Sequence, residues 1–181
     1  MPQGESLIAQ VVQARSQVLH AASGVSTQEG AWKPAPTEWS IAECVEHLVV
    51  AEQAGVSGTW AAVEGLRTGN LVWKGEPIHR GLTIEEVVRR TWAANQQAPE
   101  RALPRRGGPL GYWAAALENS QRLVDRLGEL LSGLDLEAVI FPHAVSGPLD
   151  AGQRLAFLRF HMDLHRKQIE AVKLDPRFGR S

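Results

Sequence analysis

Three histidines of the chain could together bind a metal ion. His161 and His165 are four residues apart in a segment whose apolar residues recur every three or four positions, so both rings lie on one face of a predicted helix. His47 lies in a second predicted helix, at the edge of its apolar stripe. Neutral imidazole is a strong ligand for zinc, nickel, copper and iron. Three such ligands would leave one position open for water or substrate, as in catalytic sites. The alternative is that these histidines are hydrogen-bonded core residues.

Five helical segments account for most of the chain, with almost no strand signal. Each has apolar residues at spacings of three and four, as one buried helix face requires. Residues 69–80 are expected to form a long loop, and residues 135–149 to be irregular, because Pro142, Gly147 and Pro148 interrupt them. The predicted helices cover residues 5–22, 41–67, 83–98, 111–131 and 150–176.

Three of these helices begin with a capping box, in which two side chains bond reciprocally to the free amides of the first turn. In the box before His47, the preceding Trp39 is expected to pack on Cys44 as a hydrophobic staple. Four long amphipathic helices and one short one predict an all-α fold, a four-helix bundle with a short extra helix and long connecting loops. The three boxes are Ser40 with Glu43, Thr83 with Glu86, and Asp150 with Gln153.

Composition narrows the classes of function. The 181 residues fit a single domain, 1–181, with a loose tail at 176–181. Lys and Arg total 19 against 20 Asp and Glu, so the basic excess of a nucleic-acid-binding protein is absent. The single cysteine, Cys44, excludes an internal disulfide. No apolar run is long enough to span a membrane, and no signal peptide is recognised, so we expect a cytoplasmic protein.

Two motifs resemble the DinB-like, or YfiT-type, metalloenzyme superfamily. One is the W-S-x-x-E-x-x-x-H-L pattern of residues 39–48, and the other is the H-x-x-x-H-x-x-Q-I pattern of residues 161–169. Phe141-Pro142-His143 and Gly147-Pro148-Leu149 also resemble the family's last loop. The resemblance implies a four-helix bundle, with His47 supplying one metal ligand and His161 and His165 the other two.

Other residues near these motifs have two interpretations each. Glu43 could orient His47 one turn away, although its capping role is the simpler explanation. His143 could approach the metal site or stabilise a turn. Cys44 is a buried hydrophobe or, less readily, a ligand. The basic stretch of Arg101, Arg105 and Arg106 could bind an anionic ligand or form a solvated loop.

Two hypotheses of function follow. In the first, a divalent ion, with zinc or nickel ahead of iron or manganese, activates water or a thiol that attacks a small-molecule substrate. The resemblance favours a low-molecular-weight thiol such as bacillithiol, mycothiol or glutathione, hence S-transferase or isomerase activity, with hydrolase activity as the other choice. In the second hypothesis, the bundle is a non-catalytic binding or oligomerising module with a vestigial metal site. Apolar positions on its first or fourth helix would then form a partner surface, for instance in a homodimer.

Overall fold

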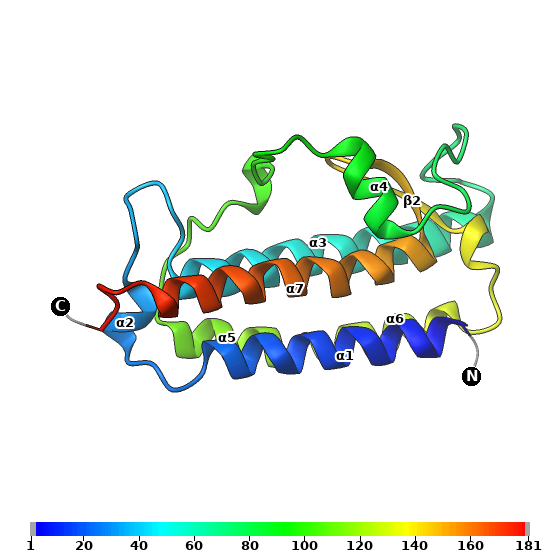
Figure 1. Cartoon of the computed structure of the whole chain (residues 1–181). Helices are drawn as coiled ribbons and strands as arrows, with labels where there is room; N and C mark the ends of the chain where they lie inside the picture. The colour runs from blue at the N-terminus through cyan, green and yellow to red at the C-terminus, as the bar shows by residue number, and fades with distance from the viewer. Residues whose placement is uncertain (1–2, 180–181) are drawn as a thin grey trace.

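The computed structural model describes residues 3–179 and is a four-helix bundle (Figure 1). Helix α1 packs along α7, α7 against α3, and α3 against α5 and α6, which return to α1. The predicted all-α bundle is confirmed, with one small hairpin added. The bundle helices are α1 (Gln3–Ala22), α3 (Ile41–Thr68), α5 (Leu110–Asn119), α6 (Gln121–Leu131) and α7 (Ala151–Leu174).

The core comes from the predicted apolar faces. On α1, Val11, Ala14 and Val18 are almost fully buried, as their spacing requires. Helix α3 has buried residues on more than one face, because it packs against α7 and also against α5 and α6. This double contact explains why a charged residue such as Glu46 lies inside. Its carboxylate accepts hydrogen bonds from the backbone amides of Arg106 (2.7 Å) and Gly107 (3.1 Å).

All three predicted capping boxes form. At the start of α3, the Ser40 amide donates to the Glu43 carboxylate (2.8 Å), and the Glu43 amide donates to the Ser40 hydroxyl (3.2 Å). The same reciprocal pair opens α4 (Ile84–Thr91) and α7. A fourth box, Ser26 with Glu29, opens the short helix α2 (Thr27–Ala31), which we had not predicted although its signal is in the sequence.

The helix predicted over 111–131 is interrupted at Ser120, between α5 and α6. The Ser120 hydroxyl bonds to the Leu117 carbonyl (2.8 Å) and to the carboxylate of Glu52, which also pairs with the buried Arg15 (2.5 Å). Serine that bonds its own helix in this way often bends it. The interruption therefore depends on a charged partner from another helix, which the local pattern could not reveal.

Helices α3 and α5 run in the same direction, so the chain must return along the bundle between them (Figure 1). This return carries α4 and the 3₁₀ turn η1 (Glu100–Ala102), and it lies over α3 and α7 in Figure 1. Helix α4 was predicted to extend to residue 98 but ends at Thr91. The backbone of Trp92 is extended and does not continue the helix. Its indole donates a hydrogen bond to the Ser146 hydroxyl (3.1 Å).

Residues predicted to be irregular form a short hairpin after the 3₁₀ turn η2 (Leu136–Ala138). Strands β1 (Ile140–His143) and β2 (Gly147–Asp150) are antiparallel, with Pro142 opposite Pro148. A two-stranded ribbon has free edges, so it tolerates prolines that a central strand would exclude. Four-residue strands containing proline carry no periodic signal, which explains the wrong prediction.

Residues of the C-terminal segment contact the loop between α2 and α3. The ring of Phe178 meets Trp32 edge-on, with centroids 5.7 Å apart. Arg177 donates to the Pro34 carbonyl (2.9 Å) and pairs with Asp175 (2.8 Å). Residues 180 and 181 of the predicted tail lie outside the described residues. Among the helices of residues 3–179, none is long and apolar enough to cross a membrane.

Candidate metal-binding site

The three predicted histidines meet between α3 and α7. The Nε2 atom of His161 lies 3.0 Å from the Nε2 atoms of both His47 and His165. One nitrogen from each of the three rings lies within 4.8 Å of the others. Two nitrogens bound to one ion at about 2.0–2.2 Å in tetrahedral geometry would lie about 3.3–3.6 Å apart, between the 3.0 Å and 4.8 Å seen in the cluster. The cluster is therefore compatible with a divalent metal ion.

Two of the rings are oriented through their second nitrogen. The Nδ1 atom of His47 lies 2.6 Å from the carbonyl oxygen of Ala102, in the segment that returns over the bundle. The Nδ1 atom of His165 lies 2.6 Å from Oε1 of Gln168, one turn further along α7. Because both partners are acceptors, each ring donates from Nδ1 and turns the lone pair of Nε2 toward the cluster. Hydrogen bonds of this kind fix ligand histidines in metal sites.

Burial keeps the three rings neutral. His47, His161 and His165 are 3%, 8% and 4% exposed. Desolvation lowers the pKa of His47, against the opposing effect of its bond to Ala102. Desolvation, and then the proximity of the other rings, lowers the pKa of His161 well below its ordinary value. Desolvation also lowers the pKa of His165 to about 3. At neutral pH all three rings are thus able to act as metal ligands.

Aromatic rings enclose the histidines. Trp39 lies over two of them, with its ring centroid 4.8 Å from that of His47 and 5.8 Å from that of His165. On the other side, Phe157 stacks on His161 at 5.2 Å. Trp39, which the sequence predicts to be a helix staple for Cys44, therefore forms a wall of the histidine cluster.

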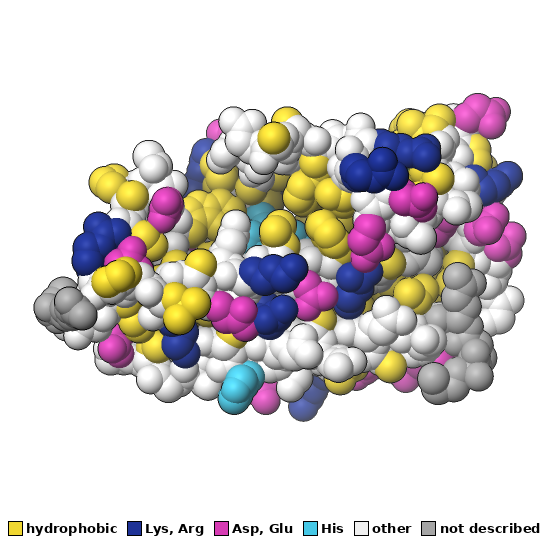
Figure 2. Space-filling model, in the orientation of Figure 1, with side chains coloured by type: hydrophobic (Ala, Val, Ile, Leu, Met, Phe, Trp, Pro, Cys, Tyr) yellow, Lys and Arg dark blue, Asp and Glu magenta, His cyan; other side chains and the backbone are white. Residues whose placement is uncertain are grey.

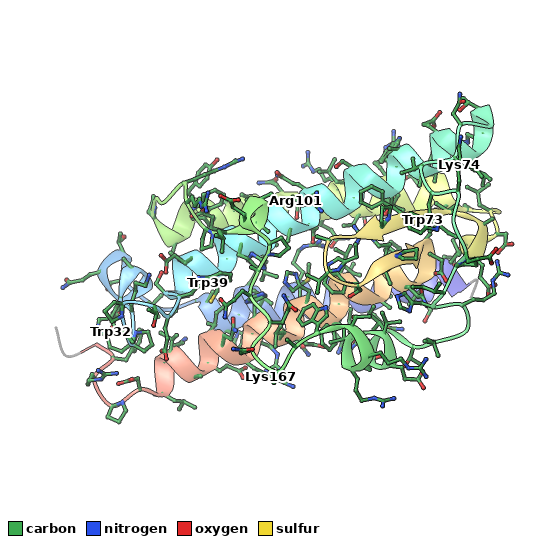
Figure 3. The ribbon with its side chains drawn as sticks, turned by 90° about the horizontal axis from the view of Figure 1, so that it is seen from above. Trp32, Trp39, Trp73, Lys74, Arg101 and Lys167 are labelled. Atoms are coloured by element: carbon green, nitrogen blue, oxygen red, sulfur yellow. The ribbon has the colours of Figure 1, made fainter. Side chains whose placement is uncertain are left out.

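The cluster opens into a cavity of ≈ 590 Å³. In Figure 2, histidine side chains are visible at the bottom of a hollow surrounded by hydrophobic side chains. Trp39 and Arg101, both labelled in Figure 3, line this cavity, together with residues of the hairpin and of α7. Its volume is in the range of small-molecule sites.

The structure also places the other candidate residues. Glu43 does not reach His47, because its carboxylate caps the Ser40 amide and pairs with Lys33 at 3.1 Å. Of the two interpretations of Glu43, the structure shows the capping role, and the carbonyl oxygen of Ala102 is the group that lies against Nδ1 of His47. The sequence could not predict Ala102 as the partner of His47, because every residue has a backbone carbonyl. Gln168, in contrast, belongs to the H-x-x-x-H-x-x-Q-I pattern and lies three residues after His165, so its contact with that ring has a signal in the sequence.

His143 lines the same cavity, at the end of β1. Its Nδ1 atom accepts hydrogen bonds from the amides of Val145 (3.3 Å) and Ser146 (3.1 Å), so it stabilises the hairpin turn. Its ring packs on Phe157, with centroids 4.4 Å apart, and is separate from the three-histidine group. Desolvation, followed by the charges of Arg154 and Arg101, lowers its pKa to about 4.

Cys44 is buried beside the cluster, as expected of a hydrophobe. Its sulfur lies 3.9 Å from Oε1 of Gln168. Burial, and to a lesser extent the charge of Glu43, raises the pKa of the thiol to about 12. The thiol is therefore protonated at neutral pH and donates toward the glutamine that orients His165.

Fold and site together define a four-helix bundle with a buried three-histidine cluster that could hold a metal ion. A family model described as the DinB superfamily matches residues 10–169, and the chain belongs to this superfamily. No curated protein matches the sequence. No solved structure matches it either.

Proposed function

We propose that the protein is a metal-dependent enzyme in which His47, His161 and His165 hold one divalent ion, with zinc or nickel as the first candidates. One observation carries the proposal: the Nε2 atom of His161 lies 3.0 Å from the corresponding atoms of the other two rings, at the bottom of an open cavity. A structural site would surround the ion with four protein ligands. Three ligands beside a cavity suit an ion that takes a substrate or co-substrate as its fourth.

Such an ion supplies a nucleophile by lowering the pKa of a bound water or thiol. The chain's own residues would orient the ligand rings and shield the site. Ala102 and Gln168 hold two ligand rings in the required tautomer, and Trp39 and Phe157 limit water around them. Shielding from water strengthens electrostatic interactions in the site.

The cavity favours a thiol as the activated group. Among the described lining residues the carboxylates are Glu38 and Asp175, and neither belongs to the histidine cluster. Asp175 is paired with Arg177. Hydrolysis by metal-bound water commonly uses a nearby carboxylate as a general base, whereas a coordinated thiol is deprotonated by the metal itself. We therefore propose a thiol-dependent S-transferase or isomerase acting on a small molecule, with hydrolysis as the second candidate reaction.

The test is elemental analysis of protein purified without a histidine tag and then incubated with zinc or nickel. We expect about one ion per chain in the parent and none in His161→Ala. His143→Asn is the matched control, because it removes a cavity histidine outside the cluster and keeps an acceptor for the amides of Val145 and Ser146. It should bind metal as the parent does.

A metal-free parent after incubation with zinc, nickel, iron and manganese would refute the proposal. It would then favour the alternative, a non-catalytic bundle that binds a partner or forms a homodimer. Metal bound equally by the parent and His161→Ala would instead place the ion elsewhere. Metal-loaded parent should next be assayed for thiol transfer to small electrophiles, with bacillithiol, mycothiol and glutathione as donors.

A further inference from the structure

Arg154 is a buried cation without a counter-charge. It lies in the first turns of α7 and is 8% exposed. Among the described residues, no carboxylate lies within ion-pair distance of its guanidinium, and its Nη1 atom has no hydrogen-bond partner. The other buried arginine, Arg15, is paired with Glu52 at 2.5 Å. An unpaired buried charge is costly to the folded state, so the position of Arg154 calls for an explanation.

Two glycines of α3 make room for this side chain and for the aromatic ring on which it packs. A Cβ atom at Gly55 would lie 3.3 Å from Nη2 of Arg154. A Cβ atom at Gly58 would lie 2.0 Å from the ring of Phe141, which therefore needs the glycine. The guanidinium of Arg154 in turn lies over that ring, 5.0 Å from its centroid. Glycine weakens a helix interior by about 1 kcal/mol relative to alanine, so α3 gives up stability where it accommodates Phe141 and Arg154.

Arg154 lines the same cavity as the three histidines. It precedes His161 by seven residues, which is two helical turns on the same face, or about 10.5 Å along the axis. The exposed Arg101, from η1, also lines the cavity. Burial, followed by the nearby charge of Arg101, lowers the pKa of Arg154 to about 10, so it remains cationic at neutral pH.

We propose that Arg154 is the anion-binding residue of this cavity, and that the substrate or co-substrate carries a carboxylate or phosphate about two helical turns from the histidine cluster. An arginine fork matches either oxyanion with two parallel hydrogen bonds. The bound anion would supply the counter-charge that the chain lacks. The position of the reacting end rests on the proposed metal site, whereas the anion site depends only on residues of the chain.

The first test therefore uses metal-free protein. Glutarate and inorganic phosphate are the probes, and the uncharged glutaramide is the control ligand. Binding is measured by calorimetry and by the shift in melting temperature. We expect at least one anion to bind the parent, and glutaramide not to bind. The probe that binds with the higher affinity identifies the preferred oxyanion as carboxylate or phosphate.

Arg154→Met should weaken anion binding by at least about tenfold, because hydrogen bonds to a charged group are lost. Arg126→Met, at an exposed arginine of α6, is the matched control and should bind as the parent does. Without anion, Arg154→Met should melt no lower than the parent, since it removes an uncompensated buried charge. If the methionine variant does not fold, Arg154→Gln provides the same comparison.

If neither anion binds the parent, the inference is overturned, and equal binding by Arg154→Met would overturn it as well. The same titrations in His161→Ala separate this inference from the proposed function. Anion binding in that variant is expected even if the protein holds no metal. Metal binding without anion binding would leave the proposed function intact and refute the role of Arg154.

A second test measures the distance between the two ends in cobalt-loaded protein. Mercaptoalkanoates from mercaptoacetate to mercaptooctanoate can place a thiol on the ion and a carboxylate on Arg154. The thiolate-to-cobalt absorption band reports binding of each compound. We expect the affinity measured in this way to be highest at an intermediate chain length in the parent. In Arg154→Met this peak should disappear. A length-independent affinity in the parent would contradict the proposed spacing.

Discussion

His47 and His161 are separated by 114 positions in the chain, yet their Nε2 atoms are 3.0 Å apart. Each ring is almost fully buried, and His47 is held by the carbonyl of Ala102 from a third segment. Neutral imidazole rings whose nitrogens lie this close together are an arrangement that a metal ion would stabilise.

Metal removal should lower thermal stability in the parent but not in His161→Ala. An ion that binds only the native state at one hundred times its dissociation constant adds about 2.7 kcal/mol. For a chain of this size, this corresponds to a shift in melting temperature of about 5–10 °C. Scanning calorimetry with and without a chelator measures the difference. Identical melting curves for the zinc-incubated parent would contradict a tightly held ion.

The metal-free protein should lose stability as the pH falls below about 6.5. His165 and His143 have pKa values of about 3 and about 4 in the folded state, both below the ordinary value of 6.5. Between pH 6.5 and 4 the unfolded chain binds protons that the folded chain does not, so acidification favours unfolding. The loss contributed by His143 begins near pH 6.5 and is complete below about pH 4.

Urea unfolding at pH 7 and pH 5 measures this effect. His143→Asn removes one of the titrating groups and should therefore show a smaller difference between the two pH values than the parent. His20→Asn, at an exposed histidine of α1, is the control and should keep the full difference. A parent equally stable at both pH values would show that these rings are not buried as neutral groups.

Gln168→Leu should weaken metal binding without removing a ligand. The change deletes the acceptor 2.6 Å from Nδ1 of His165, which fixes the tautomer and direction of that ring. Loss of such a partner typically costs about 10- to 100-fold in metal affinity. Competition with a chromophoric chelator measures the affinity. Gln17→Leu, on the exposed face of α1, should leave it unchanged, and an unchanged affinity in Gln168→Leu would exclude the orienting role.

Gly58→Ala should destabilise the protein by about 1–3 kcal/mol, the usual cost of overpacking. The new methyl group would lie 2.0 Å from the ring of Phe141, which must move together with the guanidinium above it. Gly111→Ala, where a Cβ atom meets no other group within 4 Å, should instead be neutral or stabilising by up to about 1 kcal/mol. Chemical unfolding of both variants tests the contrast. A stabilising Gly58→Ala would show that Phe141 is not confined there.

The main helices and the pair of His161 and His165 could be predicted from sequence because their signals are local. Capping boxes such as Ser40 with Glu43 place a helix start to within a residue. The four-residue spacing of His161 and His165 places both rings on one face of the helix that contains them. The link from these two to His47 came from resemblance to a family, since no local rule connects helices so far apart in the chain.

The remaining features depend on contacts between distant segments. Helix α4 ends at Thr91, where the backbone of Trp92 is extended and its indole bonds to Ser146, and the bundle helix breaks at Ser120 beside the carboxylate of Glu52. Neither partner is adjacent in sequence, so periodicity alone predicts a longer helix in both places. The unpaired charge of Arg154 is equally invisible in the sequence.

From the sequence came the helical class, most helix starts and the pair of His161 and His165, because these follow from spacing within a few turns, while the resemblance of its motifs to a family added His47. Only the tertiary structure showed that the returning segment lies over α3 and α7, where it brings Ala102 to His47 and helps enclose the cavity. The physical reason is that α3 and α5 are parallel neighbours, so the chain must travel back along the bundle between them. Where that connection packs is set by contacts between residues far apart in sequence.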